Sequence, residues 1–196
     1  MELFTDWHTW EQAEPALRRY VTATTCEAVA SAVRFAVRFH GDQLRPTGAP
    51  YLEHLLEALE VLVRGAHVTD RDVLCAAVLH DVVEDTPCTV ADVREAFGER
   101  VAVLVDWVTK PEPGPGIDKL AAKESYLRQL AGAPDDAITV KLADRASNVQ
   151  TLRNLRPQKQ REYYAQTVSY IMPLAAPRGW WASWYASWQE DHRDLA

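Results

Sequence analysis

A chain of 196 residues suits a single domain with enough mass to bury a continuous core. Its formal net charge of −7 argues against nucleic-acid binding, which needs a basic face. No apolar run approaches the roughly 20 residues of a membrane helix. Met1–Asp6 lacks the basic and apolar regions of a secretion signal. Because Cys26, Cys75 and Cys88 follow no metal-type spacing, we expect a cytoplasmic chain without a disulfide framework.

Apolar residues recur at helical spacing along most of the chain, with capping and helix-breaking residues between the segments. We expect helices over residues 26–40, 50–65, 70–80, 89–97, 101–108, 118–130, 135–149, 158–174 and 180–188. No stretch alternates with period two for long enough to form a strand. The pattern therefore predicts an all-α fold, a single bundle of about ten helices.

Three segments are expected within this bundle. Residues 1–25 form a helical arm, residues 26–176 the main domain, and residues 177–196 a Trp-rich helix that packs on it. That last helix carries a stripe formed by Trp180, Trp181, Trp184 and Trp188. The stripe either packs on the core of this chain or binds a partner, so a homo-oligomer stays possible. Residues 41–50 and 111–116, rich in Pro and Gly, are expected to be loops.

The stretch from Ala76 to Thr86 begins as an apolar helix and ends in ionisable side chains. His80 and Asp81 take the next two positions of the face that Val73 and Ala77 occupy. Burying an imidazole and a carboxylate is costly unless each finds a partner, and a divalent cation supplies one. The pair therefore indicates half of a metal site, although His-Asp pairs also occur as ordinary helix caps.

Two further candidate ligands lie on other helices. His54 shares its face with Tyr51 and Leu55, so we expect it to point inward, either as a ligand or as a satisfied core histidine. Asp144 is either a ligand or the ordinary partner of a neighbouring cation. Two imidazoles and two carboxylates would suit Mn²⁺, Fe²⁺ or Zn²⁺. Such a metal activates water and polarises phosphoryl oxygens.

Glu84 and Asp85 follow the His-Asp pair by one helical turn. Near an activated water, one carboxylate could orient or deprotonate the nucleophile while the other protonates a leaving group. The alternative is a solvated acidic loop that precedes the next helix.

Several motifs in order resemble those of the HD-domain metal-dependent phosphohydrolases, and in particular the hydrolase domain of RelA/SpoT-type alarmone enzymes. The first is HGDQLRPTGAPYLEH at residues 40–54 and the second AVLHDVVEDT at residues 77–86. VKLADR at residues 140–145, followed by Asn148 and Thr151, resembles the last. The similarity covers about residues 26–176 and leaves no room for a synthetase domain. The chain therefore resembles a stand-alone small alarmone hydrolase, similar to those of metazoans.

This resemblance implies a central Mn²⁺ site and hydrolysis of the 3′-pyrophosphate of (p)ppGpp to GDP or GTP plus pyrophosphate. The metal ligands would be His54, His80, Asp81 and Asp144. The catalytic acids would be Glu84 and Asp85. Arg45 would stack on the guanine, and the nucleoside pocket would be lined by Thr47, Asn148 and Thr151.

Three positions depart from the family pattern: Pro46 replaces a lysine, Leu55 a proline, and Ser147 a histidine or another bulky residue. Loss of the lysine removes a cation from the phosphate-binding loop, and a serine is expected to leave the pocket wall more open. These changes leave the substrate open, and an HD hydrolase acting on (p)ppApp or NADPH is the alternative. A different class is an inactive module that only binds nucleotides, and the intact set of metal ligands and catalytic acids argues against it.

Overall fold

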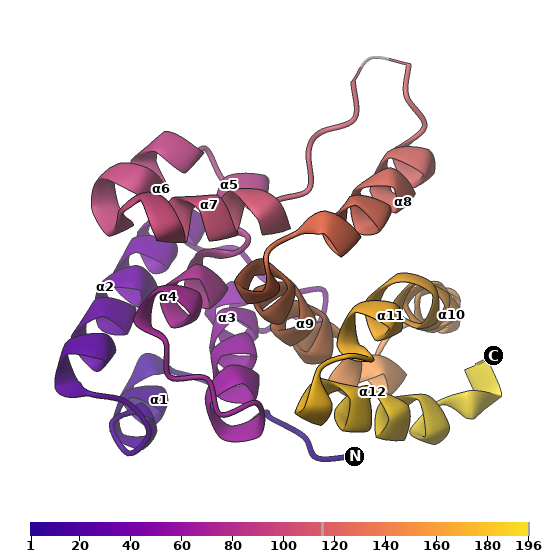
Figure 1. Ribbon diagram of the computed structural model, residues 1–196, viewed down its shortest axis with the longest axis horizontal. Coiled ribbons are helices and arrows are strands. Elements are labelled where there is room, and N and C mark those ends of the chain that lie inside the picture. Colours follow the sequence, from indigo (N-terminus) through magenta and orange to yellow (C-terminus); the bar gives the residue numbers. More distant parts are fainter. Residues whose placement is uncertain (115, 196) are drawn as a thin grey trace.

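The computed structural model describes residues 1–114 and 116–195, and its regular elements in these residues are all helices (Figure 1). Its α-helices are α1 (Trp10–Leu17), α2 (Ala23–His40), α3 (Tyr51–Glu60), α4 (Arg71–Leu79), α5 (Val82–Asp85), α6 (Val90–Phe97), α7 (Glu99–Val108), α8 (Lys119–Gln129), α9 (Asp135–Gln150), α10 (Pro157–Gln166), α11 (Met172–Ala175) and α12 (Gly179–Asp191). No strand forms among the described residues, so the all-α prediction is confirmed. No helix in this part of the chain combines the length and apolar character needed to cross a bilayer.

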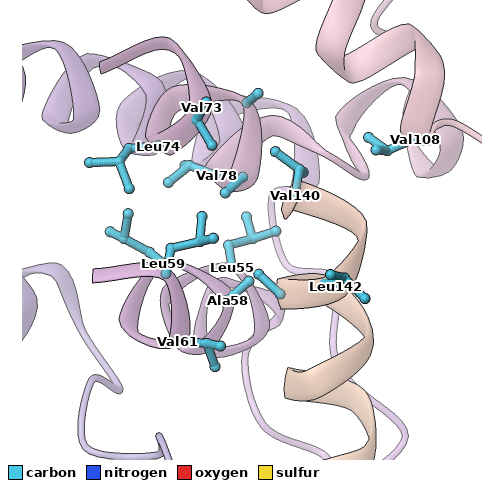
Figure 2. Close-up of a cluster of buried hydrophobic side chains, with 14 of the residues drawn as sticks. Leu55, Ala58, Leu59, Val61, Val73, Leu74, Val78, Val108, Val140 and Leu142 are labelled. Atoms are coloured by element: carbon cyan, nitrogen blue, oxygen red, sulfur yellow. The ribbon is translucent and has the colours of Figure 1, made fainter. Parts of the chain in front are cut away.

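Helix α4 lies at the centre of the bundle and packs against α2, α3, α7 and α9. Asp70 caps its first turn by accepting hydrogen bonds from the backbone N–H groups of Asp72 and Val73. From Val73 to Leu79 every residue of α4 is buried. Figure 2 shows side chains of α3, among them Leu59, directed toward α4. Each such fully buried side chain contributes about 1.5–3 kcal/mol, so this packing fixes where α4 ends.

The chain reverses between α2 and α3 in a tight turn. An isolated antiparallel bridge joins Leu44 to Pro50, and the backbone N–H of Arg45 donates to the carbonyl of Ala49 at 2.8 Å. Gly48 supplies the left-handed conformation that the turn needs, with φ of +88°. The expected loop over residues 41–50 is therefore an ordered hairpin-like turn that holds Arg45 beside the first turn of α3.

The C-terminal helix α12 packs on the N-terminal residues. The indole N–H of Trp184 donates to the carbonyl of Glu2, and that of Trp188 donates to the carbonyl of Val149, both at 3.0 Å. Both indoles are buried. Gly65 allows Trp180 to pack closely, because a Cβ at this position would lie 2.4 Å from the ring of Trp180.

The division of the chain into an arm, a main domain and a C-terminal helix, with boundaries at residues 25 and 176, stays a prediction.

Two π-helical turns depart from the predicted helices. One, Val61–Gly65, continues α3, and the other, Thr167–Ile171, divides the helix expected over residues 158–174. Pro173 lies in the first turn of α11. A proline is tolerated there because its missing N–H coincides with the change of hydrogen-bonding pattern. The loop expected over residues 111–116 includes Pro115, which lies outside the described residues.

Candidate active site

The four predicted metal ligands converge at the centre of the bundle from α3, α9 and the end of α4. The His54 Nε2 atom lies 3.0 Å from His80 Nε2. Asp81 Oδ2 lies 3.0 Å from the His80 nitrogen and 3.4 Å from the His54 nitrogen. Asp144 Oδ1 lies 3.5 and 3.6 Å from the two imidazoles. Both histidines and Asp144 are buried, with exposed fractions of 1–6%.

The hydrogen bonds on the far sides of the two imidazole rings fix their tautomers. His80 Nδ1 is 2.7 Å from the carbonyl oxygen of Ala77, which can only accept, so this nitrogen carries the proton. The Ser147 hydroxyl donates to Glu57 and therefore accepts from His54 Nδ1 at 2.8 Å. Two Nε2 lone pairs then face each other across 3.0 Å, an arrangement that is repulsive unless a proton or a cation lies between them.

The spacing of these donor atoms fits a divalent cation. Ligand atoms about 2.1 Å from a shared ion lie about 3.0 Å apart in octahedral and about 3.4 Å apart in tetrahedral coordination. The observed separations of 3.0–3.6 Å cover this range. His54, His80 and Asp81 form the tightest group, with ligand atoms all within 4.8 Å of one another. The mixed N/O donor set supports a divalent metal and leaves its identity open.

The electric charges of the cluster are strongly coupled. Burial opposes ionisation, but His80 and the hydrogen bonds from both imidazoles hold the pKa of Asp81 well below its usual range. Burial likewise opposes the charge on Asp144, yet Lys141 holds its pKa well below the usual range. The two carboxylates in turn outweigh burial and raise the pKa of His54 and of His80. The cluster therefore keeps its carboxylates ionised and ready to hold positive charge.

Side chains outside the predicted set orient both carboxylates. The hydroxyl of Tyr51 donates to Asp81, and Lys141 Nζ lies 2.8 Å from Asp144 Oδ2. Asn148 donates to Asp144 Oδ1 at 2.6 Å, so a predicted nucleoside-pocket residue also touches a predicted ligand. The pairing of Asp144 with a neighbouring cation was one of the two alternatives from the sequence, and Lys141 is that cation. The orienting role of Tyr51 was not predicted, although Tyr51 stands three residues before His54 on the same face of α3.

The two predicted catalytic acids differ in their surroundings. Glu84 accepts from the backbone N–H of Lys110 at 2.9 Å and is also bonded to the Lys110 ammonium. Asp85 is exposed and accepts from the Gln43 amide at 3.2 Å. Both carboxylates line the same cavity as the ligand cluster. Lys110 thus compensates the charge of Glu84, a contact that the sequence analysis did not anticipate.

Two cavities open beside the cluster. The first, about 210 Å³, is lined by His54, Asp81, Asp144, Glu84, Asp85, Lys110, Lys123, Lys141 and Arg145, among others. The second, about 460 Å³, is lined by Arg45, Pro46, Thr47, Asn148, Thr151, Asn154, Leu155, Arg156, Lys159 and Tyr163. The two cavities are contiguous, because four residues line both: Arg45, Pro46, Asn148 and Tyr163. All four predicted substrate-binding residues therefore surround the second cavity.

Two of the departures from the family pattern have a structural outcome. Ser147 does not open the pocket wall: it is fully buried between His54 and Glu57. Leu55, where a proline was the family residue, lies in the first turns of α3 and packs into the core. The expectation for Ser147 failed because its side chain turns toward α3 rather than toward the cavity.

The fold and the ligand cluster define the class. A model of the HD domain matches residues 32–181, so the chain belongs to the HD-domain family. Particular relatives are more specific. The guanosine-3′,5′-bis(diphosphate) 3′-pyrophosphohydrolase of Aquifex aeolicus is 38% identical over 163 residues, 80% of this chain and 22% of the relative. The bifunctional (p)ppGpp synthase/hydrolase SpoT of Escherichia coli is 33% identical over 171 residues, 86% and 24% respectively.

The chain thus spans less than a quarter of the length of these curated relatives. One solved structure matches this chain over nearly its own whole length. It is described as a metazoan ortholog of SpoT that hydrolyses ppGpp and plays a role in starvation responses. It is 26% identical, with a TM-score of 0.76 over 86% of this chain and 97% of that one.

Proposed function

We propose that this chain is a Mn²⁺-dependent enzyme that hydrolyses the 3′-pyrophosphate of (p)ppGpp, releasing GDP or GTP and pyrophosphate. The observation that carries the proposal is the pair of contiguous cavities. One is lined by His54, Asp81, Asp144 and the two acids, and the other, at about 460 Å³, lies within the usual size range of small-ligand pockets. The names of the relatives support this choice of substrate.

The charge distribution supports a substrate with several phosphates. The chain carries a net charge of −7, yet both cavities are lined by cations. Lys123 lies 5.7 Å and Lys159 4.8 Å from the ring centroid of Tyr163, which lines both cavities. Burial and the charge of Arg145 lower the pKa of Lys123. Positive charge concentrated in this way would favour binding of a multiply anionic nucleotide.

The proposed roles follow from the contacts of each residue. His54, His80, Asp81 and Asp144 would hold the cation. When bound, a divalent cation supplies Lewis-acid chemistry, polarising a phosphoryl oxygen and activating water. Both oxygens of Glu84 are engaged by Lys110, so Glu84 would accept a hydrogen bond from the nucleophilic water and orient it. Asp85, bound through one oxygen to Gln43, would be the carboxylate that moves the proton.

The nucleoside would occupy the second cavity. Arg45 lines this cavity, and its guanidinium group would stack on the purine. Thr47, Asn148 and Thr151 would supply polar contacts to the nucleoside. A cytoplasmic location and a homo-oligomer also stay predictions.

The deciding experiment is turnover by the chelated protein with and without added Mn²⁺. Purified protein would be incubated separately with ppGpp, its adenosine analogue and NADPH. We expect pyrophosphate release from ppGpp only after Mn²⁺ is restored. Phosphate release from NADPH alone would show that ppGpp is not the substrate. Turnover of the adenosine analogue at the same rate as ppGpp would contradict the proposed preference for guanosine. Binding of all three nucleotides without turnover would indicate a binding module instead.

A further inference from the structure

Behind the ligand cluster lies a series of hydrogen-bonded side chains whose two middle residues, Ser147 and Glu57, have no role in the proposed reaction. It runs from His54 through Ser147 and Glu57 to Arg45. The Ser147 hydroxyl lies 2.8 Å from His54 Nδ1 and 2.5 Å from Glu57 Oε2. Arg45 Nη1 lies 2.8 Å from Glu57 Oε1. Glu57 is 6% exposed and Ser147 is fully buried, so water does not supply alternative partners to either.

The donor and the acceptor of each of these three hydrogen bonds follow from the groups that form it. The Arg45 guanidinium can only donate, so Glu57 accepts from it. Ser147 has one hydroxyl proton, and the Glu57 carboxylate beside it is the charged acceptor. The Ser147 oxygen is then left to accept, and it requires a proton on His54 Nδ1. The Nε2 lone pair of His54 is thereby directed at the ligand cluster.

The two ends of this chain lie at the two ends of the site. His54 belongs to the ligand cluster, while Arg45 lines the second cavity, where the nucleoside is proposed to bind. Glu57 stands three residues after His54 on the same face of α3, and Ser147 three residues after Asp144 on α9. These hydrogen bonds between side chains therefore connect α3, α9 and the turn before α3.

We propose that Ser147 and Glu57 are positioning residues that connect the metal-binding and nucleoside-binding ends of the site. Ser147 holds the imidazole of His54 in the metal-binding tautomer and orientation. Glu57 holds the Arg45 guanidinium in the plane in which it meets the purine. This inference rests on the proposed function for the identity of the nucleotide, whereas its metal-binding half stands on the donor cluster alone.

The first test measures Mn²⁺ affinity by calorimetry, without substrate. Ser147→Ala removes the acceptor of the His54 Nδ1 proton, so the dissociation constant should rise about 10–100-fold. Ser147→Thr keeps the hydroxyl and should restore affinity to within about threefold of the wild type. Ser31→Ala, whose hydroxyl bonds to the Glu27 carbonyl within α2, is the control and should change nothing. Circular dichroism of the chelated variants establishes that they are folded.

The second test separates the other half of the chain. In Glu57→Gln the single amide oxygen should turn to the buried Ser147, because Arg45 can turn to the open cavity instead. The amide N–H then faces the guanidinium and repels it. We expect the dissociation constant of GDP, and the KM for ppGpp, to rise about tenfold, with Mn²⁺ affinity within about threefold of the wild type. Glu53→Gln is the control, since Glu53 lies on α3 but faces His8.

The outcomes distinguish this inference from the proposed function. Unchanged Mn²⁺ affinity in Ser147→Ala would overturn the His54 half, whatever the substrate is. Unchanged GDP affinity in Glu57→Gln would overturn the Arg45 half. If the wild type binds Mn²⁺ and GDP but does not hydrolyse ppGpp, the proposed reaction fails and both comparisons still decide the inference. If the wild type does not bind GDP, the Arg45 half fails together with the proposed substrate.

Discussion

The metal-binding end and the nucleoside-binding end of the site are built differently. At the first, His54 and His80 are at most 3% exposed, and their ring nitrogens have partners inside the bundle. At the second, Pro46 and Thr47 are exposed residues of the turn before α3. Groups held by buried partners are already placed for chemistry, whereas an exposed turn can change its contacts at little cost. Substitutions should therefore abolish function at the first end and tune it at the second.

The largest effect should come from Asp81→Ala. This change removes the carboxylate that approaches both imidazoles, so Mn²⁺ affinity should collapse and turnover of ppGpp should fall about 10³-fold or more. Calorimetry and a turnover assay measure the two losses, and circular dichroism should be unchanged. A variant that is folded and retains wild-type turnover would remove Asp81 from the proposed ligand set.

A smaller effect is expected from Lys159→Met at the nucleoside end. Lys159 lines the second cavity, and its loss should raise the KM for ppGpp about fivefold while kcat stays within about twofold. The increase should shrink at high salt, because the Lys159 ammonium is exposed to solvent. Arg19→Met, which removes an exposed cation in the turn after α1, is the control. A fall in kcat with unchanged KM would place Lys159 in the chemical step and break the contrast between the two ends.

The pH dependence of stability tests the metal-binding end. The carboxylates raise the pKa of both imidazoles above the unfolded value of about 6.5. In the metal-free protein their stabilisation is therefore complete below that pH, and it is lost as pH rises through the folded pKa. Mn²⁺ binding needs neutral imidazoles.

The difference in Tm between Mn²⁺-loaded and chelated protein should consequently widen as pH rises above about 6.5, by about 2–4 °C for each kcal/mol of added stabilisation. Differential scanning calorimetry at several pH values measures this difference. A difference that narrows as pH rises would contradict the proposed role of the two histidines.

The smallest effect is expected from Pro46→Lys. Restoring a cation beside both cavities should lower the KM for ppGpp about threefold, since an exposed charge contributes less than about 1 kcal/mol. Pro46→Gln separates the added charge from the lost proline ring. Equal KM values for the two variants would show that the backbone, and not the charge, is responsible.

Much of the fold follows from the sequence because the helical period is clear and the caps are standard. Asp70 and Thr89 cap α4 and α6 where the pattern places them. The π-helical turn before Pro173 did not follow, because the apolar spacing of a five-residue turn differs little from that of an α-helix. The local pattern could not distinguish the two.

The candidate metal ligands could be predicted from the sequence, but the side chains that hydrogen-bond to them and orient them could not. His80 and Asp81 stand out because charged groups on an apolar face need a partner. The contact between Ser147 and Glu57 joins residues 90 positions apart, and each alone is an ordinary polar residue. Only the packing of α3 against α9 brings them together. A single sequence holds no local signal for such a pair.

The absence of a side chain at Gly65 has an optical consequence. Trp180 rests directly on this glycine, next to Phe4, and shares α12 with three further tryptophans of the seven in the chain. Four of the seven tryptophans lie on α12, so tryptophan emission reports strongly on the surroundings of that helix. Fluorescence should register the separation of α12 as its own event, while a spectroscopic probe in the ligand cluster would record the opening of the bundle centre.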